Sequence, residues 1–192
     1  MPKPKPKLLI VVASTRPGRV GRPVADWFWQ VAEQHGGFEI EEADLAELNL
    51  PLLDEPNHPR LQQYTKEHTR AWSATVAAAD AFVFVTPEYN HSYPASLKNA
   101  VDYLHQEWRH KPLGFVSYGG IAGGTRSVQA FKQVASALMM YVANNLVNIS
   151  FVHAKIKDGV FVEDDGVRAA ANAMLDELLQ LSGALSSLRT GS

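Results

Sequence analysis

Short runs of hydrophobic residues alternate along this chain with longer segments in which hydrophobic residues recur every three or four positions. Four of the runs are nearly continuous, at residues 8–13, 81–86, 113–118 and 148–154. Such runs are typical of parallel strands that helices cover on both faces. A fifth segment, FEIEEADL from Phe38, alternates apolar and charged residues, which predicts a strand at the edge of the sheet.

The segments between these runs have the period of amphipathic helices. The first begins near Pro23, which a helix tolerates in its first turn, and has apolar residues at five phased positions: Val24, Trp27, Phe28, Val31 and Ala32. The second follows Pro94 and extends over residues 95–104. Further helices are predicted at about residues 61–79, 126–139 and 167–188, with turns at Gly159 and at residues 164–166.

Strands and helices in this alternation predict an α/β fold, a three-layer doubly wound sheet of five parallel strands. The strand order is either Rossmann-like or the flavodoxin-like order 2-1-3-4-5, and a count of five strands favours the flavodoxin-like order. The length of 192 residues and the 46% hydrophobic content suit one domain over residues 1–192.

Composition narrows the possible partners. With 18 Lys+Arg against 20 Asp+Glu, the net charge of -2 gives no basic surface for nucleic acid or for anionic lipid. No apolar run approaches the roughly 20 residues that span a bilayer, so we expect a soluble, cytoplasmic protein whose partner is a small molecule. The chain has no cysteine, and a redox function would therefore need a bound cofactor.

The loop after the first strand has the composition of a phosphate site. In doubly wound sheets, ligands bind beyond the carboxyl ends of the strands. This loop combines hydroxyls, guanidinium groups and glycines directly before a helix, in the sequence Ser14-Thr15-Arg16-Pro17-Gly18-Arg19-Val20-Gly21. The N–H groups and dipole of a helix N-terminus favour an anion. The alternative interpretation is a solvated loop with turn glycines.

The loop after the third strand suits a planar heterocycle. It reads Pro87-Glu88-Tyr89-Asn90-His91-Ser92-Tyr93-Pro94, with prolines that stiffen the backbone, an aromatic face and an amide that both donates and accepts. The alternative is an ordinary rigid turn. In the following helix, Lys98 and Asp102 are interpreted as a surface ion pair at i, i+4.

The loop after the fourth strand is rich in glycine, from Gly119 to Gly124, which lets backbone N–H groups approach a ligand closely. It nearly matches a Walker A sequence, but Thr125-Arg126 stands where lysine and a hydroxyl residue are required, which argues against an NTPase. The chain also lacks the G-x-G-x-x-G, G-x-S-x-G and H-E-x-x-H motifs of dinucleotide-binding proteins, serine hydrolases and zinc proteases.

Three segments, ASTRPGRVG, PEYNHSYPASLKNAVDYL and the Ser117-Tyr118-Gly119-Gly120 loop, make the chain resemble the NADPH-dependent FMN reductases, which include quinone, azo and chromate reductases. The resemblance implies an FMN phosphate held by the first loop, at Ser14, Arg16, Arg19, Val20 and Gly21. It implies that Pro87, Glu88, Tyr89 and Asn90 line the isoalloxazine. It places the other edge of the ring against Ser117, Tyr118, Gly119 and Gly120.

The function that this resemblance implies is hydride transfer from NADPH or NADH to FMN, followed by reduction of a quinone, azo compound, metal oxyanion or free flavin in a ping-pong mechanism. Because the cofactor carries the chemistry, we assign no catalytic side chain and no metal. Family members resemble homodimers or tetramers, for which Trp29 and Trp108 are possible interface anchors. The alternative functions are a flavodoxin-type electron carrier and a flavin-responsive binding protein without nicotinamide turnover.

Overall fold

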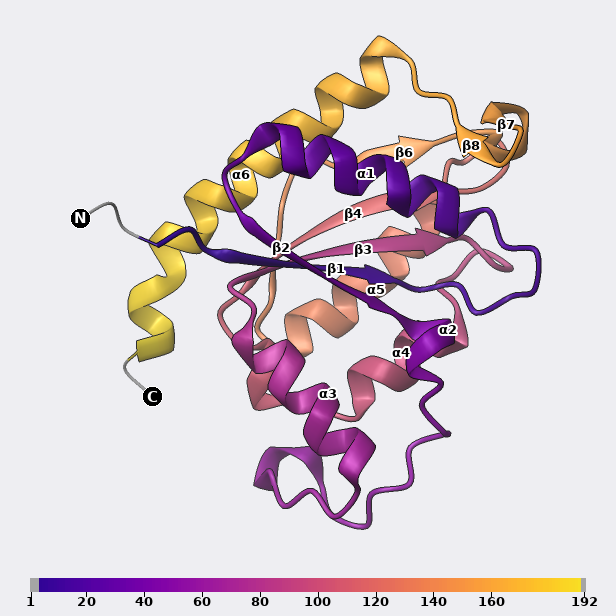
Figure 1. Cartoon of the computed structure of the whole chain (residues 1–192). Coiled ribbons are helices and arrows are strands. Elements are labelled where there is room, and N and C mark those ends of the chain that lie inside the picture. Colours follow the sequence, from indigo (N-terminus) through magenta and orange to yellow (C-terminus); the bar gives the residue numbers. More distant parts are fainter. Residues whose placement is uncertain (1–3, 191–192) are drawn as a thin grey trace.

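The computed structural model describes residues 4–190 and contains the expected parallel sheet. Its central strands are β1 (Lys7–Val12), β3 (Ala81–Pro87) and β4 (Pro112–Tyr118), and its edge strands are β2 (Glu39–Asp44) and β5 (Tyr141–Val142). They lie in the order β2-β1-β3-β4-β5, all parallel, which confirms the flavodoxin-like topology (Figure 1). As expected, β2 is an edge strand, and its first four residues are exposed or half-buried.

Helices cover both faces of the sheet, so the predicted three layers are present (Figure 1). On one face lie α1 (Gly21–His35) and α6 (Asp165–Thr190). On the other lie α2 (Leu45–Leu48), α3 (Glu67–Ala78), α4 (Ala95–Asp102) and α5 (Thr125–Ala137). Alternate residues of a strand point to opposite faces, and β1 accordingly divides its residues: Leu8 and Ile10 pack under α1 and α6, while Leu9 and Val11 join the opposite core.

The outer edge beyond β4 differs from the sequence prediction of one strand at residues 148–154. Two short strands pair with β4 instead: β5, and β6 (Val147–Ile149) farther along. The chain then turns at Phe151, which has a φ of 49°, into the short 3-10 helix η3 (Val152–Lys155). The N–H groups of Phe151 and Val152 donate to the carbonyls of Gly120 and Gly119 at 3.0 and 3.1 Å. These residues therefore bond to the glycine loop, and β6 does not continue beyond Ile149.

Other boundaries differ at the ends of helices. The helix predicted from about residue 61 begins at Glu67, because residues 59–61 form the separate 3-10 helix η1 (Pro59–Leu61). Residues 106–108 form η2 (Gln106–Trp108), and a hairpin of β7 (Ile156–Lys157) and β8 (Val160–Phe161) turns at Gly159, as expected, with φ at 78°. No helix within residues 4–190 is both long enough and apolar enough to cross a membrane.

Trp108, proposed above as an interface anchor, is a core residue. It is fully buried and packs edge-on against Trp72, Phe82 and Phe84, and its indole N–H donates to the carbonyl of Val101 at 3.1 Å. The prediction was wrong because the sequence pattern near Trp108 does not show that η2 packs its tryptophan into the core between β3 and α3. Trp29 is half-buried against the other core.

Candidate functional site

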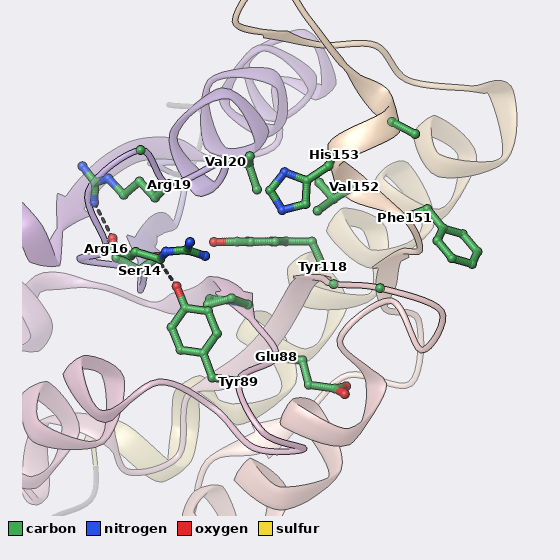
Figure 2. Close-up of a pocket in the computed structure, with 15 residues that line it drawn as sticks. Ser14, Arg16, Arg19, Val20, Glu88, Tyr89, Tyr118, Phe151, Val152 and His153 are labelled. Carbon is green, nitrogen blue, oxygen red and sulfur yellow. Dashed lines mark hydrogen bonds between the residues drawn. The ribbon is translucent and has the colours of Figure 1, made fainter.

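The three strand-exit loops enclose one cavity of about 450 Å³ at the carboxyl ends of β1, β3 and β4 (Figure 2). This is the position expected for a ligand in a doubly wound sheet. Most of the residues assigned to a cofactor by the resemblance line the cavity, namely Ser14, Arg16, Arg19, Val20, Pro87, Glu88, Tyr89, Tyr118, Gly119 and Gly120. Gly21, Asn90 and Ser117 are not among the lining residues.

The end of α1 that faces the cavity is suited to an anion. No side chain caps its first turn, and the first turn contains no acidic residue. The guanidinium of Arg16 is exposed in the cavity wall and donates no hydrogen bond to any of residues 4–190. Free N–H groups at a helix N-terminus beside an unpaired arginine form a site for a phosphate group.

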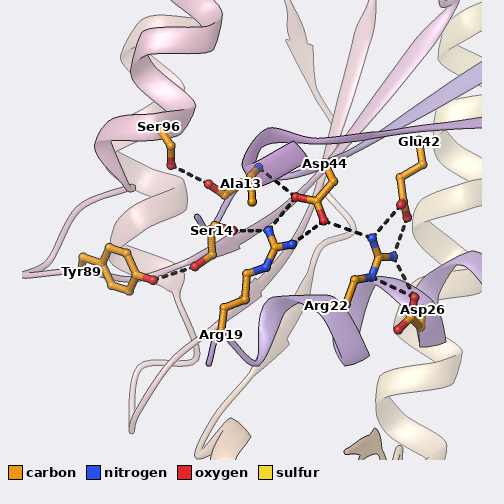
Figure 3. Close-up of polar contacts among 10 residues, drawn as sticks. Ala13, Ser14, Arg19, Arg22, Asp26, Glu42, Asp44, Tyr89 and Ser96 are labelled. Atoms are coloured by element: carbon orange, nitrogen blue, oxygen red, sulfur yellow. Dashed lines mark hydrogen bonds and ion pairs between the residues drawn. The ribbon is translucent and has the colours of Figure 1, made fainter. Parts of the chain in front are cut away.

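The second arginine of this loop is committed to a buried carboxylate. Arg19 donates to both carboxylate oxygens of Asp44 at 2.6 Å and also to the carbonyl of Ser14 at 2.5 Å (Figure 3). Asp44 lies at the end of β2, and its side chain is only 1% exposed. Arg19 therefore fixes the backbone of the first loop by bonding the Ser14 carbonyl and Asp44. Arg16 is the other arginine of this loop, and its guanidinium can still bind a ligand.

Asp44 is held in its charged form by these contacts. Burial by itself raises the pKa of this carboxyl group, but the hydrogen bonds from Arg19 and from the N–H of Ala46 lower it. The positive charges of Arg19 and Arg22 lower it further, and the pKa lies below the ordinary value of 3.8. Arg22 also binds Glu42 and Asp26, so the network extends along the outside of α1 (Figure 3).

A hydrogen bond of 2.8 Å joins the hydroxyl groups of Ser14 and Tyr89 (Figures 2 and 3). Ser96, in the first turn of α4, donates to the carbonyl of Ala13 at 2.6 Å. These two contacts connect the first loop to the loop after β3 and to the helix that follows it. The two loops therefore keep a fixed spacing, which a ligand that contacts both of them requires.

Tyr118 lies across the cavity with its ring edge-on in Figure 2. Its side chain is buried, its hydroxyl has no hydrogen-bond partner within residues 4–190, and burial raises the pKa of the phenol well above its usual range. A Cβ at Gly21 would lie 2.4 Å from this hydroxyl oxygen. Glycine at position 21 is therefore needed for α1 to pack against Tyr118. An unpaired buried hydroxyl in a cavity wall is a group that a polar ligand can satisfy.

The glycine loop is supported from behind by Ser117, whose hydroxyl donates to the carbonyl of Gly123 at 2.8 Å. Gly124 has a φ of 86°, and a Cβ there would lie 2.6 Å from that of Ser117, so only glycine fits. The N–H of Gly119 donates to the carbonyl of Ile149 at 3.2 Å and is therefore not available to a ligand. Gly120 lines the cavity, and a Cβ there would meet no atom within 4 Å, while its carbonyl accepts the N–H groups of Gly123 and Phe151.

Glu88 lines the cavity with its backbone and stem, while its carboxylate points away from Tyr118 (Figure 2). One carboxylate oxygen accepts the N–H of Arg126 in the first turn of α5 at 3.1 Å, and the other accepts the Arg126 guanidinium at 2.6 Å. This charge compensates the N-terminus of α5, whose N-cap residue Gly124 has no side chain. Glu88 thus joins the loop after β3 to the glycine loop.

The fourth wall of the cavity was missing from the sequence prediction. It is formed by residues that the sequence pattern assigned to a strand: Phe151, Val152, His153 and Ala154. The available signal was His153, a polar residue at the end of an apolar run, which is the same signal that located the other three loops. Figure 2 shows the His153 ring on the same side of the cavity as Val20.

The strand order defines a flavodoxin-like fold, and its cavity has an uncapped helix N-terminus on one side and two tyrosine rings in its walls. The family model for NADPH-dependent FMN reductases matches residues 6–154. The chain belongs to this family. It is therefore an oxidoreductase that uses FMN with NADPH or NADH as co-substrate.

Individual relatives agree with this assignment. An NAD(P)H-dependent FMN reductase of Schizosaccharomyces pombe is 43% identical over 157 residues, which cover 81% of this chain and 78% of the relative. An FMN-dependent NADPH-azoreductase of Staphylococcus haemolyticus is 27% identical and covers 90% and 93%. The solved structure of an NAD(P)H:acceptor oxidoreductase from Paracoccus denitrificans has a TM-score of 0.73 at 19% identity, covers 93% and 98%, and shows the same fold.

Proposed function

We propose that this protein transfers two electrons from NADPH or NADH to a planar small-molecule acceptor, a quinone or an azo compound, with metal oxyanions and free flavin as further acceptors. The observation that carries the proposal is one cavity that lies between the uncapped N-terminus of α1, with the unpaired Arg16, and walls formed by Tyr89 and Tyr118. When bound there, FMN supplies the hydride chemistry, and the protein supplies binding, orientation and exclusion of water. For a quinone, the balance is NAD(P)H, one proton and quinone giving NAD(P)⁺ and hydroquinone.

In this proposal Arg16 and the first turn of α1 hold the phosphate, with Ser14 beside them. Pro87 and Tyr89 border the ring on one side, and Tyr118 and Gly120 border it on the other. The unpaired donors of Arg16 and Tyr118 support this arrangement, because both lack a partner within residues 4–190. Arg19 and Glu88 hold the loops through Asp44 and Arg126.

We propose a ping-pong order because the nicotinamide and the acceptor would share one cavity. All three loops and the segment 151–154 border the same continuous space. The oxidised nicotinamide must then leave before the acceptor enters. Steady-state rates measured with both substrates varied are expected to give parallel double-reciprocal lines, and intersecting lines would show a ternary complex instead.

The test of the function is to purify the protein, identify its chromophore by mass and titrate it anaerobically with NADH and NADPH. We expect FMN, bleached by a stoichiometric amount of at least one nicotinamide and reoxidised by a quinone. A flavodoxin-type carrier would keep its flavin oxidised in nicotinamide alone, and a flavin-responsive binding protein would show no turnover. Either of these results would contradict the proposal.

We further propose that the chain assembles into a homodimer or tetramer. Two large apolar side chains beside the cavity support this, since Phe151 is 60% and Ile121 76% exposed. Light scattering at micromolar concentration tests the assembly, and a monomer would refute it.

A cytoplasmic location remains a prediction from the sequence, which subcellular fractionation tests.

A further inference from the structure

A second cavity, of about 360 Å³, lies at the opposite end of the sheet, where β3 and β4 begin. Its walls come from the end of α3, the segment 106–111 and the end of α6. Four basic residues line it, three of them consecutive in the chain: Arg109, His110, Lys111 and Arg189. Two carboxylates also line it, those of Asp80 and Glu107.

The carboxylates of Glu107 and Asp80 each accept hydrogen bonds from other residues of the protein. Glu107 is buried and accepts from the hydroxyl groups of Tyr64 and Ser73 at 2.8 and 2.7 Å, and its other oxygen accepts the N–H of His105 at 3.2 Å. Asp80 accepts the N–H of Lys7 at 2.9 Å and the guanidinium of Arg189 at 3.2 Å. Neither carboxylate accepts a hydrogen bond from Arg109 or Lys111 within residues 4–190.

Lys111, Arg109 and His110, in contrast, have polar atoms that are not fully used, whereas Arg189 donates to Asp80 and to the carbonyls of His110 and Ser182. Lys111 is only 6% exposed, and its ammonium donates to the carbonyls of Val76 and Ala77, which uses two of its three N–H bonds. Arg109 donates to Gln106, while its buried Nε has no hydrogen-bond partner within residues 4–190. The buried Nδ1 of His110 has no such partner in the same range.

The charges around Lys111 are not balanced by the protein. Burial, together with the positive charge of Arg189, lowers the pKa of this lysine to about 8, against the opposing effect of Asp80 and Glu107. Two arginines, Arg109 and Arg189, line the cavity together with Lys111, against the two carboxylates of Asp80 and Glu107. A buried cation with donors to spare is stabilised by an anion that accepts charge-assisted hydrogen bonds.

We propose that this cavity binds a phosphate group, either as inorganic phosphate or as the phosphate of a small metabolite, held by Arg109, Lys111 and Arg189. Guanidinium forks match the geometry of phosphate oxygens, and the lysine adds a point charge. The site is separate from the flavin cavity, because it lies at the amino ends of the strands and shares no lining residue with that cavity. The proposal does not rest on the proposed electron acceptor.

The test uses the full-length protein saturated with FMN, so that the first phosphate site is filled. Calorimetric titration with inorganic phosphate, and separately with ribose 5-phosphate, is expected to show one saturable site. Tighter binding of the ester identifies a metabolite phosphate, and equal or weaker binding identifies the free ion. Arg109→Gln should weaken binding about tenfold or more, because it removes charge-assisted hydrogen bonds. Lys157→Gln, which removes one charge from exposed β7, should leave it unchanged.

A second measurement avoids any dependence on how a variant folds. In the wild-type protein, the pKa of Lys111 followed by NMR should rise when phosphate is added, because a bound anion favours the ammonium form. No saturable binding of either ligand overturns the proposal. Equal binding by Arg109→Gln, or a Lys111 pKa that phosphate does not change, also overturns it and leaves Lys111 only as a cap on the end of α3.

Discussion

Asp44 is the residue on which the shape of the loop after β1 depends. Its buried carboxylate accepts hydrogen bonds from both terminal nitrogens of Arg19, and Arg19 also donates to the carbonyl of Ser14. Removing one partner of a buried ion pair leaves the other charge uncompensated. We expect Asp44→Asn to lower the free energy of unfolding by about 3 kcal/mol at pH 7, measured by urea denaturation. Asp26→Asn, whose side chain is 58% exposed, should cost less than about 1 kcal/mol.

The same pair predicts a dependence on pH. The pKa of Asp44 in the folded protein lies below its ordinary value of 3.8, so the folded state favours the carboxylate. Its contribution to stability is complete above that ordinary value and disappears as the pH falls through the folded pKa. The difference in unfolding free energy between wild type and Asp44→Asn should therefore be constant near neutral pH and narrow below pH 3.8. A difference that persists in acid would show that packing, not charge, is responsible.

Arg16 differs from Arg19 because it has no protein partner within residues 4–190, and this predicts its effect on ligands. Arg16→Ala should weaken FMN binding about tenfold or more and change riboflavin binding little, since only FMN has the phosphate that accepts its charge-assisted bonds. Fluorescence titration of the apoprotein with both flavins measures this. Arg70→Ala, an exposed arginine on α3, serves as the charge control. Equal weakening of FMN and riboflavin would remove Arg16 from the phosphate site.

At the scale of elements, Glu88 is the contact that fixes α5 to the loop after β3. The N-terminus of α5 has a glycine N-cap with no side chain, and the Glu88 carboxylate takes over that role from another loop. Glu88→Gln keeps the shape of the side chain but removes the negative charge that the helix dipole favours. We expect a loss of about 1 kcal/mol in unfolding free energy and faster amide exchange in the first turn of α5. Glu33→Gln, on exposed α1 surface, is the control, and unchanged exchange in α5 would contradict this role.

At the scale of the whole molecule, the sheet separates two hydrophobic cores. Phe84 and Phe131 share the core under α3, α4 and α5, with ring centroids 5.5 Å apart, whereas Leu178 of α6 lies in the core on the other face. Residues in contact couple energetically, and residues that share no partners act additively. Phe84→Leu with Phe131→Leu should show a coupling energy of about 0.5 kcal/mol or more in denaturant unfolding.

The matched cycle uses Phe131→Leu with Leu178→Val, one substitution in each core. Their effects on the unfolding free energy should add to within about 0.5 kcal/mol. A coupling across the sheet as large as that between the two phenylalanines would mean that the strands transmit repacking from one core to the other. The candidate site at the carboxyl ends of the strands would then respond to substitutions in either core.

The sequence by itself determined the layered fold and the edge of the sheet at which the candidate cavity lies. Both follow from local information: continuous apolar runs require burial on both faces, helical periodicity lies between them, and parallel strands place their exit loops at one edge. The composition of those loops then indicated phosphate and ring binding. The strand order 2-1-3-4-5, favoured by the count of five strands, is confirmed, and so is the family resemblance, which rested on three sequence segments.

Only the tertiary structure decided which partner each polar side chain has. Arg19 and Asp44 are 25 positions apart, and Glu88 and Arg126 are 38 apart, so neither pair leaves a periodic signal in the chain. The apolar run 148–154 contained no sign that Phe151 and Val152 would bond to the glycine loop instead of extending β6. Hydrophobic pattern specifies which face of an element is buried, but hydrogen-bond partners and turns depend on the distant segments that folding brings alongside.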